Sequence, residues 1–121
     1  MKKTILTGIA TAALAFSASA EVKVGNPMAV TGPIPDLVAP MVSAVDLAAQ
    51  HVNEQGGLFS DGQTYTIVRA DSGCDPTAAV DAVTKLVNVE QVSAIIGPVC
   101  SGATIAQAQS AMEFAQDSLA K

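Results

Sequence analysis

Beyond the first twenty residues, the hydrophobic period of the chain switches regularly between that of a strand and that of a helix. The first β-forming positions run up to a break at residues 31–35, where a glycine and two prolines stop any regular element. A helical pattern follows, with Pro40 in its first turn and Gly56 and Gly57 at its end. Residues 65–70 then have the composition of a strand. The apolar positions expected on the inner face of the helix are Met41, Val45, Ala48 and Val52.

The second part of the chain repeats this plan. Asp75 is a natural N-cap and Pro76 a natural first helical residue, and apolar residues then recur at spacings of three and four. The apolar run at residues 92–96 has no polar alternation, which predicts a strand covered on both faces. From Ser101 onward a third helix is expected, because apolar residues again recur at helical spacing.

This series of elements predicts an α/β fold. Three strands that alternate with three helices imply an open parallel sheet flanked by helices, with right-handed crossovers and the strand order 2-1-3. Open parallel sheets bind ligands at the carboxyl ends of their strands, where the strand order reverses. The loops at residues 31–37 and 97–104 flank that point, so they are the expected binding surface.

The first twenty residues have the pattern of a signal peptide. Lys2 and Lys3 precede an apolar stretch at residues 5–16, and the small residues at 18–20 suit a signal peptidase that cleaves after Ala20. The alternative is a membrane anchor, but the apolar stretch is short for a bilayer span. No cysteine follows the small residues, so a soluble exported product with no membrane insertion is expected.

Charge and composition exclude several partners. Cleavage after Ala20 leaves 4 basic and 11 acidic side chains, a net charge of −7. Such a surface offers no electrostatic footprint for nucleic acid or anionic lipid. Aromatic residues make up only 3% of the chain, so aliphatic side chains must supply nearly all of the core.

The residues give little support to an enzyme. There is no Gly-x-Gly-x-x-Gly and no phosphate-cradling lysine motif, which argues against a nucleotide cofactor. His51 is the only histidine and is expected to be a solvated helix residue, not a catalytic base or metal ligand. No nucleophile with a base and no metal cluster stands out, so neither a catalytic residue nor a metal site is expected.

The two cysteines, Cys74 and Cys100, follow the second and third predicted strands and therefore lie at one edge of the sheet. Export favours a disulfide between them, the alternative being two buried, reduced thiols. Closing this 26-residue loop stabilises the fold by about 3.5 kcal/mol in the chain-entropy model. The polar turn from Ser101 to Thr104 opens a helix directly after Cys100, and helix starts gather N–H groups that bind anions.

Four segments, taken together, resemble the leucine/isoleucine/valine-binding family of periplasmic substrate-binding proteins of ABC transporters. Their order and intervals fit the family, and the resemblance covers the signal region and roughly residues 22–110. The segments are Thr-Gly-Pro-Ile at 31–34, Asn-Glu-Gln-Gly-Gly at 53–57, Asp-Ser-Gly-Cys-Asp-Pro at 71–76 and Ile-Gly-Pro-Val-Cys-Ser at 96–101.

The resemblance implies two α/β lobes that close over one amino acid and present the closed form to a membrane permease. It implies a bridge between Cys74 and Cys100 in the first lobe. It also implies that Ser101 holds the α-carboxylate of the ligand, and Thr104 in the same turn is expected to join it. Leu37 stands where the family often has an aromatic residue against the ligand side chain. A leucine still offers apolar contact but lacks a ring face, so the expected ligand is either a branched aliphatic amino acid or a different small carboxylate or amide. Alternatively, Leu37 packs under the first helix.

The sequence departs from the family toward its end. Residues 21–110 are interpreted as part of an N-terminal lobe, and residues 111–121 as an atypical helical tail in place of a short strand that carries further ligand contacts. The expected function is the substrate-binding component of an amino-acid uptake system in truncated form, without the second lobe. A sensing receptor of the same fold and a non-binding remnant are the alternatives. With one wall of a cleft, weak or absent amino-acid binding is expected, and an exposed strand edge predicts self-association.

Overall fold

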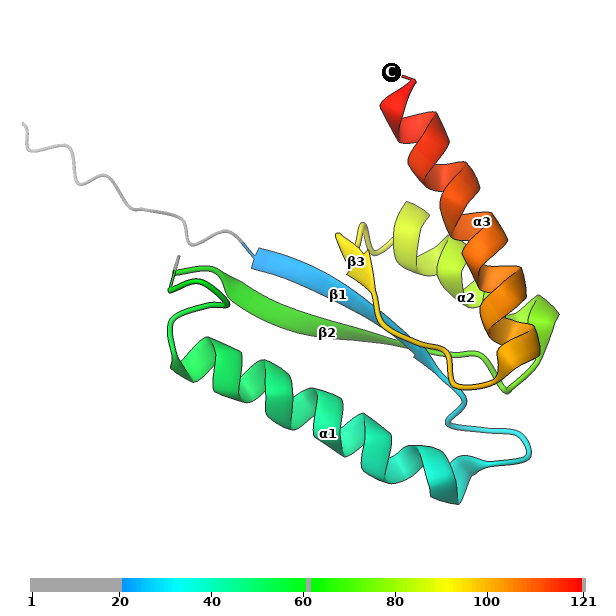
Figure 1. The fold of residues 1–121 in the computed structure, drawn as a ribbon, viewed down its shortest axis with the longest axis horizontal. Helices are drawn as coiled ribbons and strands as arrows, with labels where there is room; N and C mark the ends of the chain where they lie inside the picture. Colours follow the sequence, from blue (N-terminus) through cyan, green and yellow to red (C-terminus); the bar gives the residue numbers. More distant parts are fainter. Residues whose placement is uncertain (1–20, 61, 121) are drawn as a thin grey trace, which may run out of the picture.

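The computed structural model describes residues 21–60 and 62–120, which form a three-layer α/β unit (Figure 1). The three parallel strands lie in the order β2-β1-β3, so the predicted fold class and strand order are confirmed. The strands are β1 (Glu21–Met28), β2 (Thr64–Asp71) and β3 (Ala94–Ile95). The helices are α1 (Pro35–Glu54), α2 (Pro76–Asn88) and α3 (Ser101–Leu119). The predicted signal peptide and its cleavage after Ala20 lie outside the described residues.

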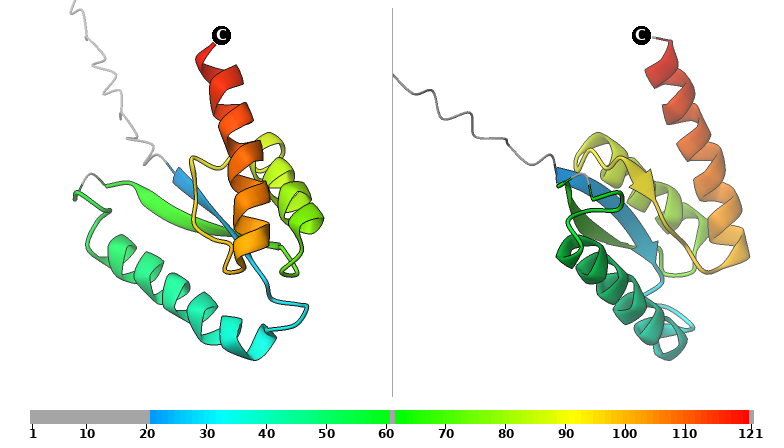
Figure 2. Two further views of the ribbon diagram at one scale, coloured as in Figure 1. Left: turned by 45° about the vertical axis from the view of Figure 1, so that its right-hand side comes forward. Right: turned by 60° about the vertical axis from the view of Figure 1, so that its left-hand side comes forward.

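The sheet separates α1 on one face from α2 and α3 on the other (Figure 2). β1 and β2 pair over eight residues, from Glu21 opposite Thr64 to Met28 opposite Asp71. β3 pairs with β1 at only two positions and is an edge strand. The prediction that residues 92–96 are covered on both faces is wrong, because the side chain of Ile96 is 54% exposed. The apolar composition of residues 92–96 does not guarantee that other elements pack over both faces of the strand.

Helix α1 begins at Pro35, five residues before the predicted start. Pro35 suits the first helical position as well as Pro40 does, and the carbonyl of Ile34 accepts the N–H groups of Leu37 and Val38, both at 3.2 Å. Pro40 therefore lies inside the helix. The inner face is also shifted in part from the predicted stripe. Its half-buried and buried members are Val38, Val42, Val45, Ala49 and Val52, whereas Met41 and Ala48 are exposed.

Helix α2 starts as the sequence predicts and supplies much of the core. The Asp75 side chain accepts a hydrogen bond from the Ala78 N–H at 2.8 Å, with Pro76 as the first helical residue. Leu86 is 1% exposed and packs over the bare backbone of Gly25 in β1, where an added Cβ would lie 3.0 Å from the Leu86 Cδ1. The other buried residues of this helix are Ala79, Ala82 and Val83.

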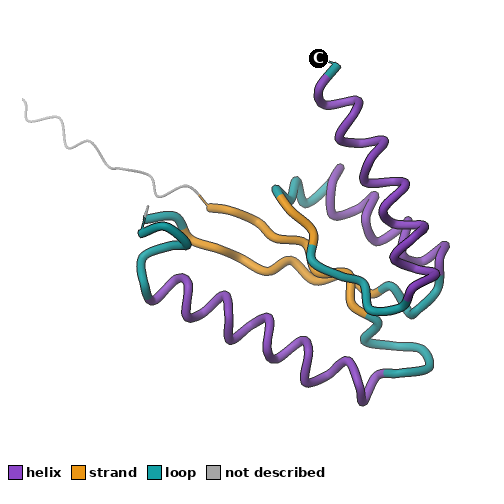
Figure 3. The backbone as a smooth tube through the Cα atoms, viewed as in Figure 1, coloured by secondary structure: helices purple, strands orange, loops and turns teal. Residues whose placement is uncertain are grey.

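Helix α3 packs on α2 and runs without interruption from Ser101 to Leu119. The residues predicted as an atypical helical tail from position 111 are helical as far as Leu119 and belong to the helix that begins at Ser101. Its carboxyl-terminal half carries exposed apolar side chains, among them Met112 and Leu119. The start of this helix, like the starts of α1 and α2, lies at the carboxyl edge of the sheet (Figure 3).

Candidate functional site

The candidate site is the carboxyl edge of the sheet, where the loops after all three strands meet (Figure 3). The strand order reverses between β1 and β3, so the loops after these two strands flank the usual ligand position of an open parallel sheet. Two links, one covalent and one polar, join the three loops to one another.

The covalent link is a disulfide between Cys74 and Cys100. Their Cα atoms are 5.3 Å apart, within the normal range for a bridge. Both cysteines are half-buried and pack against a core cluster of Met28, Ala29 and Val38. The bridge therefore fixes the start of α3 to the loop that precedes α2, and the alternative of two reduced thiols does not apply to this structure.

The polar link runs from the loop after β1 to the end of β2. The Asp71 carboxylate accepts hydrogen bonds from the Thr31 hydroxyl, from the Thr31 N–H at 3.3 Å and from the Gly73 N–H at 2.9 Å. Partial burial raises the pKa of Asp71, but these hydrogen bonds outweigh it and hold the pKa below its ordinary value. Sequence reasoning named Asp71 only as the first residue of the segment at 71–76 and missed this role.

The same two loops also meet backbone to backbone. Gly32 has a φ of +94°, and a Cβ built on it would lie 2.4 Å from the Gly73 carbonyl oxygen. Only glycine permits both this conformation and this approach. The Thr-Gly and Asp-Ser-Gly segments at the ends of neighbouring strands are the sequence signal for this contact, once the sheet order is known.

Ser101 is the first residue of α3 and is exposed. Cys100, not Ser101, occupies the N-cap, and it gives no side-chain cap hydrogen bond. The first N–H with a partner in the helix is that of Thr104, which donates to the Cys100 carbonyl at 2.9 Å. The N–H groups of Ser101, Gly102 and Ala103 thus lie in the uncapped first turn, at the positive end of the helix dipole. This arrangement suits a carboxylate or another small anion.

The Thr104 hydroxyl is engaged by the backbone of the loop before it. Its oxygen lies 2.9 Å from the Cys100 carbonyl and 3.3 Å from the Pro98 carbonyl, to which it can donate its one hydrogen. The hydroxyl thereby holds the loop to the helix and keeps only acceptor capacity for a ligand. Ligand contact by Thr104 remains a prediction.

Leu37 lies in the first turn of α1 with its side chain 56% exposed. The alternative interpretation, in which it packs under the helix, does not describe this residue, since the neighbouring Val38 is fully buried in that place. The Leu37 side chain is therefore accessible for apolar contact at the rim of the site. Contact with a ligand remains a prediction here too.

Two amide side chains that sequence reasoning missed hold the loop before Ser101. The Asn26 Nδ2 donates to the Ile96 carbonyl at 2.6 Å, and the Gln107 Nε2 donates to the Gly97 carbonyl at 2.8 Å. Asn26 is fully buried, and its Oδ1 accepts a hydrogen bond from Arg69. An amide among the apolar residues at 24–28 was the signal that could have identified Asn26, because a buried amide needs partners.

Neither a metal-binding group nor a membrane-spanning helix is found among the described residues. Over residues 21–60 and 62–120, no group of three or more His, Cys, Asp or Glu side chains is placed to hold a metal ion. None of the helices in these ranges is both long and apolar enough to cross a bilayer. His51 is exposed on α1, as the sequence predicts.

Comparison with known proteins places this geometry in context. Residues 21–114 match the family model described as periplasmic binding protein. The chemotactic signal transduction system substrate-binding protein BasB of Halobacterium salinarum is 36% identical over 97 residues, which are 78% of this chain and 23% of that protein. Leu/Ile/Val-binding protein homolog 1 of Brucella abortus is 35% identical over 112 residues, 90% of this chain and 29% of that protein.

Solved structures show the same relationship. The branched-chain amino acid transporter substrate binding protein LivJ of Streptococcus pneumoniae, in complex with isoleucine, superposes with a TM-score of 0.71 at 29% identity, over 77% of this chain and 26% of that one. The leucine binding protein LivK of Thermotoga maritima gives 0.66 at 27% identity, over 76% and 25%. The chain thus spans about a quarter of the length of these relatives.

Proposed function

The chain belongs to the periplasmic binding protein family, and from that premise we propose that it is the substrate-binding component of an ABC-type uptake system for an amino acid of the branched-chain type. Members of this family are exported to the periplasm and bind substrates instead of transforming them. We propose likewise that the export signal is cleaved after Ala20 and that residues 21–110 are part of the N-terminal lobe.

The observation that carries the proposal is the uncapped start of α3 beside the disulfide. Ser101 offers a hydroxyl and, with Gly102 and Ala103, the first-turn N–H groups at the positive end of the helix dipole. These groups can hold an α-carboxylate without an opposing full charge. Leu37, exposed at the start of α1, offers apolar contact to an aliphatic side chain on the same edge of the sheet.

A site that forms only one wall of a cleft leaves much of the ligand in water and therefore binds it with limited affinity. The described residues form three strands and three helices with the candidate site open at the sheet edge, and small-molecule sites normally bury most of the ligand surface. We therefore expect weak or no binding of leucine, isoleucine and valine to this chain by calorimetry. A dissociation constant in the micromolar range or tighter would contradict this expectation.

The carboxylate contact itself is tested by an NMR titration of the ¹⁵N-labelled chain with L-leucine at millimolar concentration. We expect amide shifts at residues 101–104 that are lost in Ser101→Ala and kept in Ser43→Ala, a matched change at an exposed serine of α1. Leucinamide, which has the same side chain but no carboxylate, serves as the control ligand. Equal shifts with leucinamide, or leucine-dependent shifts elsewhere in the chain without any at the start of α3, would refute the assignment of Ser101.

A second candidate function is a sensing receptor that delivers the bound ligand to a signalling partner. The similarity to BasB, which is named for chemotactic signal transduction, favours it. Both functions use the same site, so they differ in the protein that recognises the ligand-bound form. Genes for a permease and an ATPase beside this gene support uptake, whereas a neighbouring transducer gene supports sensing.

A further inference from the structure

A polar network joins α1 to strands β1 and β2. Its centre is Arg69 in β2, whose register partner in β1 is Asn26. The Arg69 guanidinium group donates a hydrogen bond to the Asn26 Oδ1. On α1 it also donates to the Val42 carbonyl at 3.1 Å and to the Asp46 carboxylate. Asn26 is fully buried and Arg69 is half-buried, so the network ties α1 to the interior of the sheet.

The chemistry of its two neighbours fixes the orientation of the Asn26 amide. A guanidinium group can only donate hydrogen bonds, so the amide oxygen must face Arg69. A backbone carbonyl can only accept, so the amide nitrogen must face Ile96, to whose carbonyl it donates at 2.6 Å. A flipped amide would set oxygen against oxygen and N–H against N–H. At a fully buried position no water replaces the lost partners, so Arg69 determines which atom of Asn26 reaches the loop after β3.

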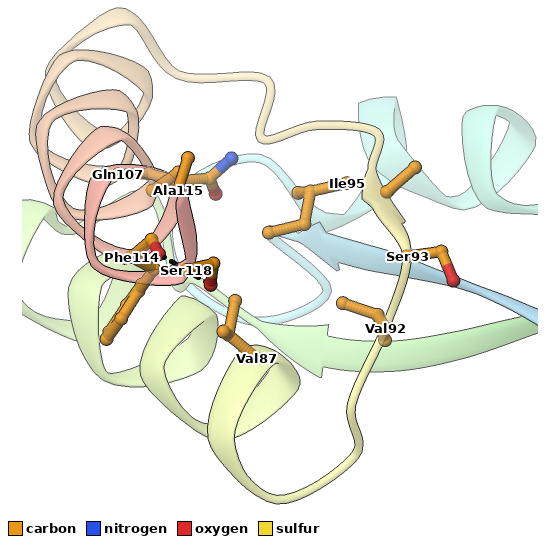
Figure 4. Close-up of a pocket in the computed structure, with 10 residues that line it drawn as sticks. Val87, Val92, Ser93, Ile95, Gln107, Phe114, Ala115 and Ser118 are labelled. Carbon is orange, nitrogen blue, oxygen red and sulfur yellow. Dashed lines mark hydrogen bonds between the residues drawn. The ribbon is translucent and has the colours of Figure 1, made fainter. Parts of the chain in front are cut away.

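This loop leads directly to Ser101, and two amide side chains hold its successive carbonyl groups. Asn26 in β1 binds the Ile96 carbonyl. Gln107, which extends from α3 toward β3 (Figure 4), binds the Gly97 carbonyl at 2.8 Å. A Cβ added to Gly97 would lie 3.3 Å from the nearest atom of β1, so the loop packs closely on this strand. Only three residues separate Gly97 from Ser101, and the anchored carbonyls therefore limit where α3 begins.

We propose that Arg69 and Asn26 are positioning residues of the candidate site, which couple the placement of α1 to that of the loop before α3. The two coupled elements carry the two assigned ligand contacts, Leu37 at the start of α1 and Ser101 at the start of α3. The network thereby sets the separation between the apolar and the carboxylate-binding sides. In treating these sides as parts of one ligand site the inference rests on the proposed function, whereas the coupling is a property of the ligand-free chain.

The first test is hydrogen exchange of the ligand-free, ¹⁵N-labelled chain, followed by NMR. Arg69→Met keeps an unbranched side chain and removes the donors. The reporters are the Asn26 side-chain amide and the Ile96 backbone amide, which donates to the Gly25 carbonyl at 2.8 Å. We expect both to exchange at least about tenfold faster, relative to the β1–β2 ladder. A general loss of stability accelerates ladder and loop alike. Lys85→Met, which removes a charge at an exposed position of α2, is the matched control and leaves both reporters unchanged.

Asn26→Asp separates the two halves of the network and covers the case in which Arg69→Met does not fold. Aspartate has the shape of asparagine and keeps an oxygen toward Arg69, but it sets a second acceptor against the Ile96 carbonyl. We expect the Ile96 amide to exchange at least about tenfold faster at pH 7, with the helix amides around Val42 and Asp46 unchanged. Ile96 exchange that follows the β1–β2 ladder in the variants that fold would overturn the inference and leave Arg69 with only a local role in attaching α1.

An L-leucine titration at millimolar concentration distinguishes this inference from the proposed function. Where the wild-type chain responds at residues 101–104, Asn26→Asp is expected to bind at least about threefold more weakly, because the loosened loop must be ordered again on binding. Equal affinity would overturn the positioning role. A wild-type chain that does not respond to leucine counts against the proposed function, and the exchange of the Ile96 amide still decides whether the coupling exists.

Discussion

Reduction of the bridge between Cys74 and Cys100 should remove a large part of the stability of this small unit. The cysteines are 26 residues apart in sequence. In the chain-entropy model, opening a loop of this length returns about 12 cal/mol/K to the unfolded chain, or about 3.5 kcal/mol at 25 °C. Domains are typically stable by about 5–15 kcal/mol, so the loss is substantial. For a unit of about 100 residues it corresponds to a fall in melting temperature of roughly 14–28 °C.

The assay is urea unfolding followed by circular dichroism, on the oxidised chain and on the same chain with dithiothreitol. Reduction of the native chain separates the bridge from packing, because both cysteine side chains contact the core cluster and stay in place. The double variant Cys74→Ala/Cys100→Ala is the control and should not respond to dithiothreitol. Oxidised and reduced curves that coincide within about 0.5 kcal/mol would refute the reasoning, as would two reactive thiols in the untreated protein.

Two further predictions concern the contact between the loop after β1 and the end of β2. Gly32→Ala should destabilise the fold by more than Gly56→Ala, measured by urea unfolding. Both glycines have positive φ, a conformation that costs alanine about 1–2 kcal/mol. A Cβ added at Gly32 meets the Gly73 carbonyl, whereas one added at Gly56 meets nothing within 4 Å. Equal losses of unfolding free energy in the two variants would contradict the close approach. The pKa of Asp71 is lower in the folded chain than in the unfolded chain, so the ionised carboxylate stabilises the fold. This contribution is complete above the pKa of the unfolded chain and is lost as the pH falls through the pKa of the folded chain. Stability should therefore drop below about pH 4, and less steeply in Asp71→Asn; identical pH profiles would exclude the role of this carboxylate.

Local sequence signals predicted the elements that depend on neighbours along the chain. Asp75 and Pro76 specify the start of α2 by capping geometry, and the structure has both in those roles. The start of α1 was less well determined, because Pro35 and Pro40 each satisfy the requirement for a first helical residue. The longer helix buries Val38, so packing against the sheet favours the earlier start.

The candidate site was located from the sequence in outline only. The alternation of strands and helices placed the binding surface at the carboxyl edge of the sheet, together with the turn that begins at Ser101. The contacts that shape this edge join residues far apart in sequence, such as Thr31 with Asp71 across 40 positions and Asn26 with Ile96 across 70. No local pattern encodes them.

The sequence by itself determined the α/β class, the three-stranded parallel order and the edge at which the loops gather, because hydrophobic period and turn chemistry are properties of short segments. Only the tertiary structure decided that Ile96 is exposed, that the Asp71 carboxylate holds the loop after β1 and that Gln107 keeps a buried acceptor without a donor among the described residues. These features depend on which distant residues come into contact. A buried polar atom acquires its partners, or remains without one, only when the layers of the fold pack together.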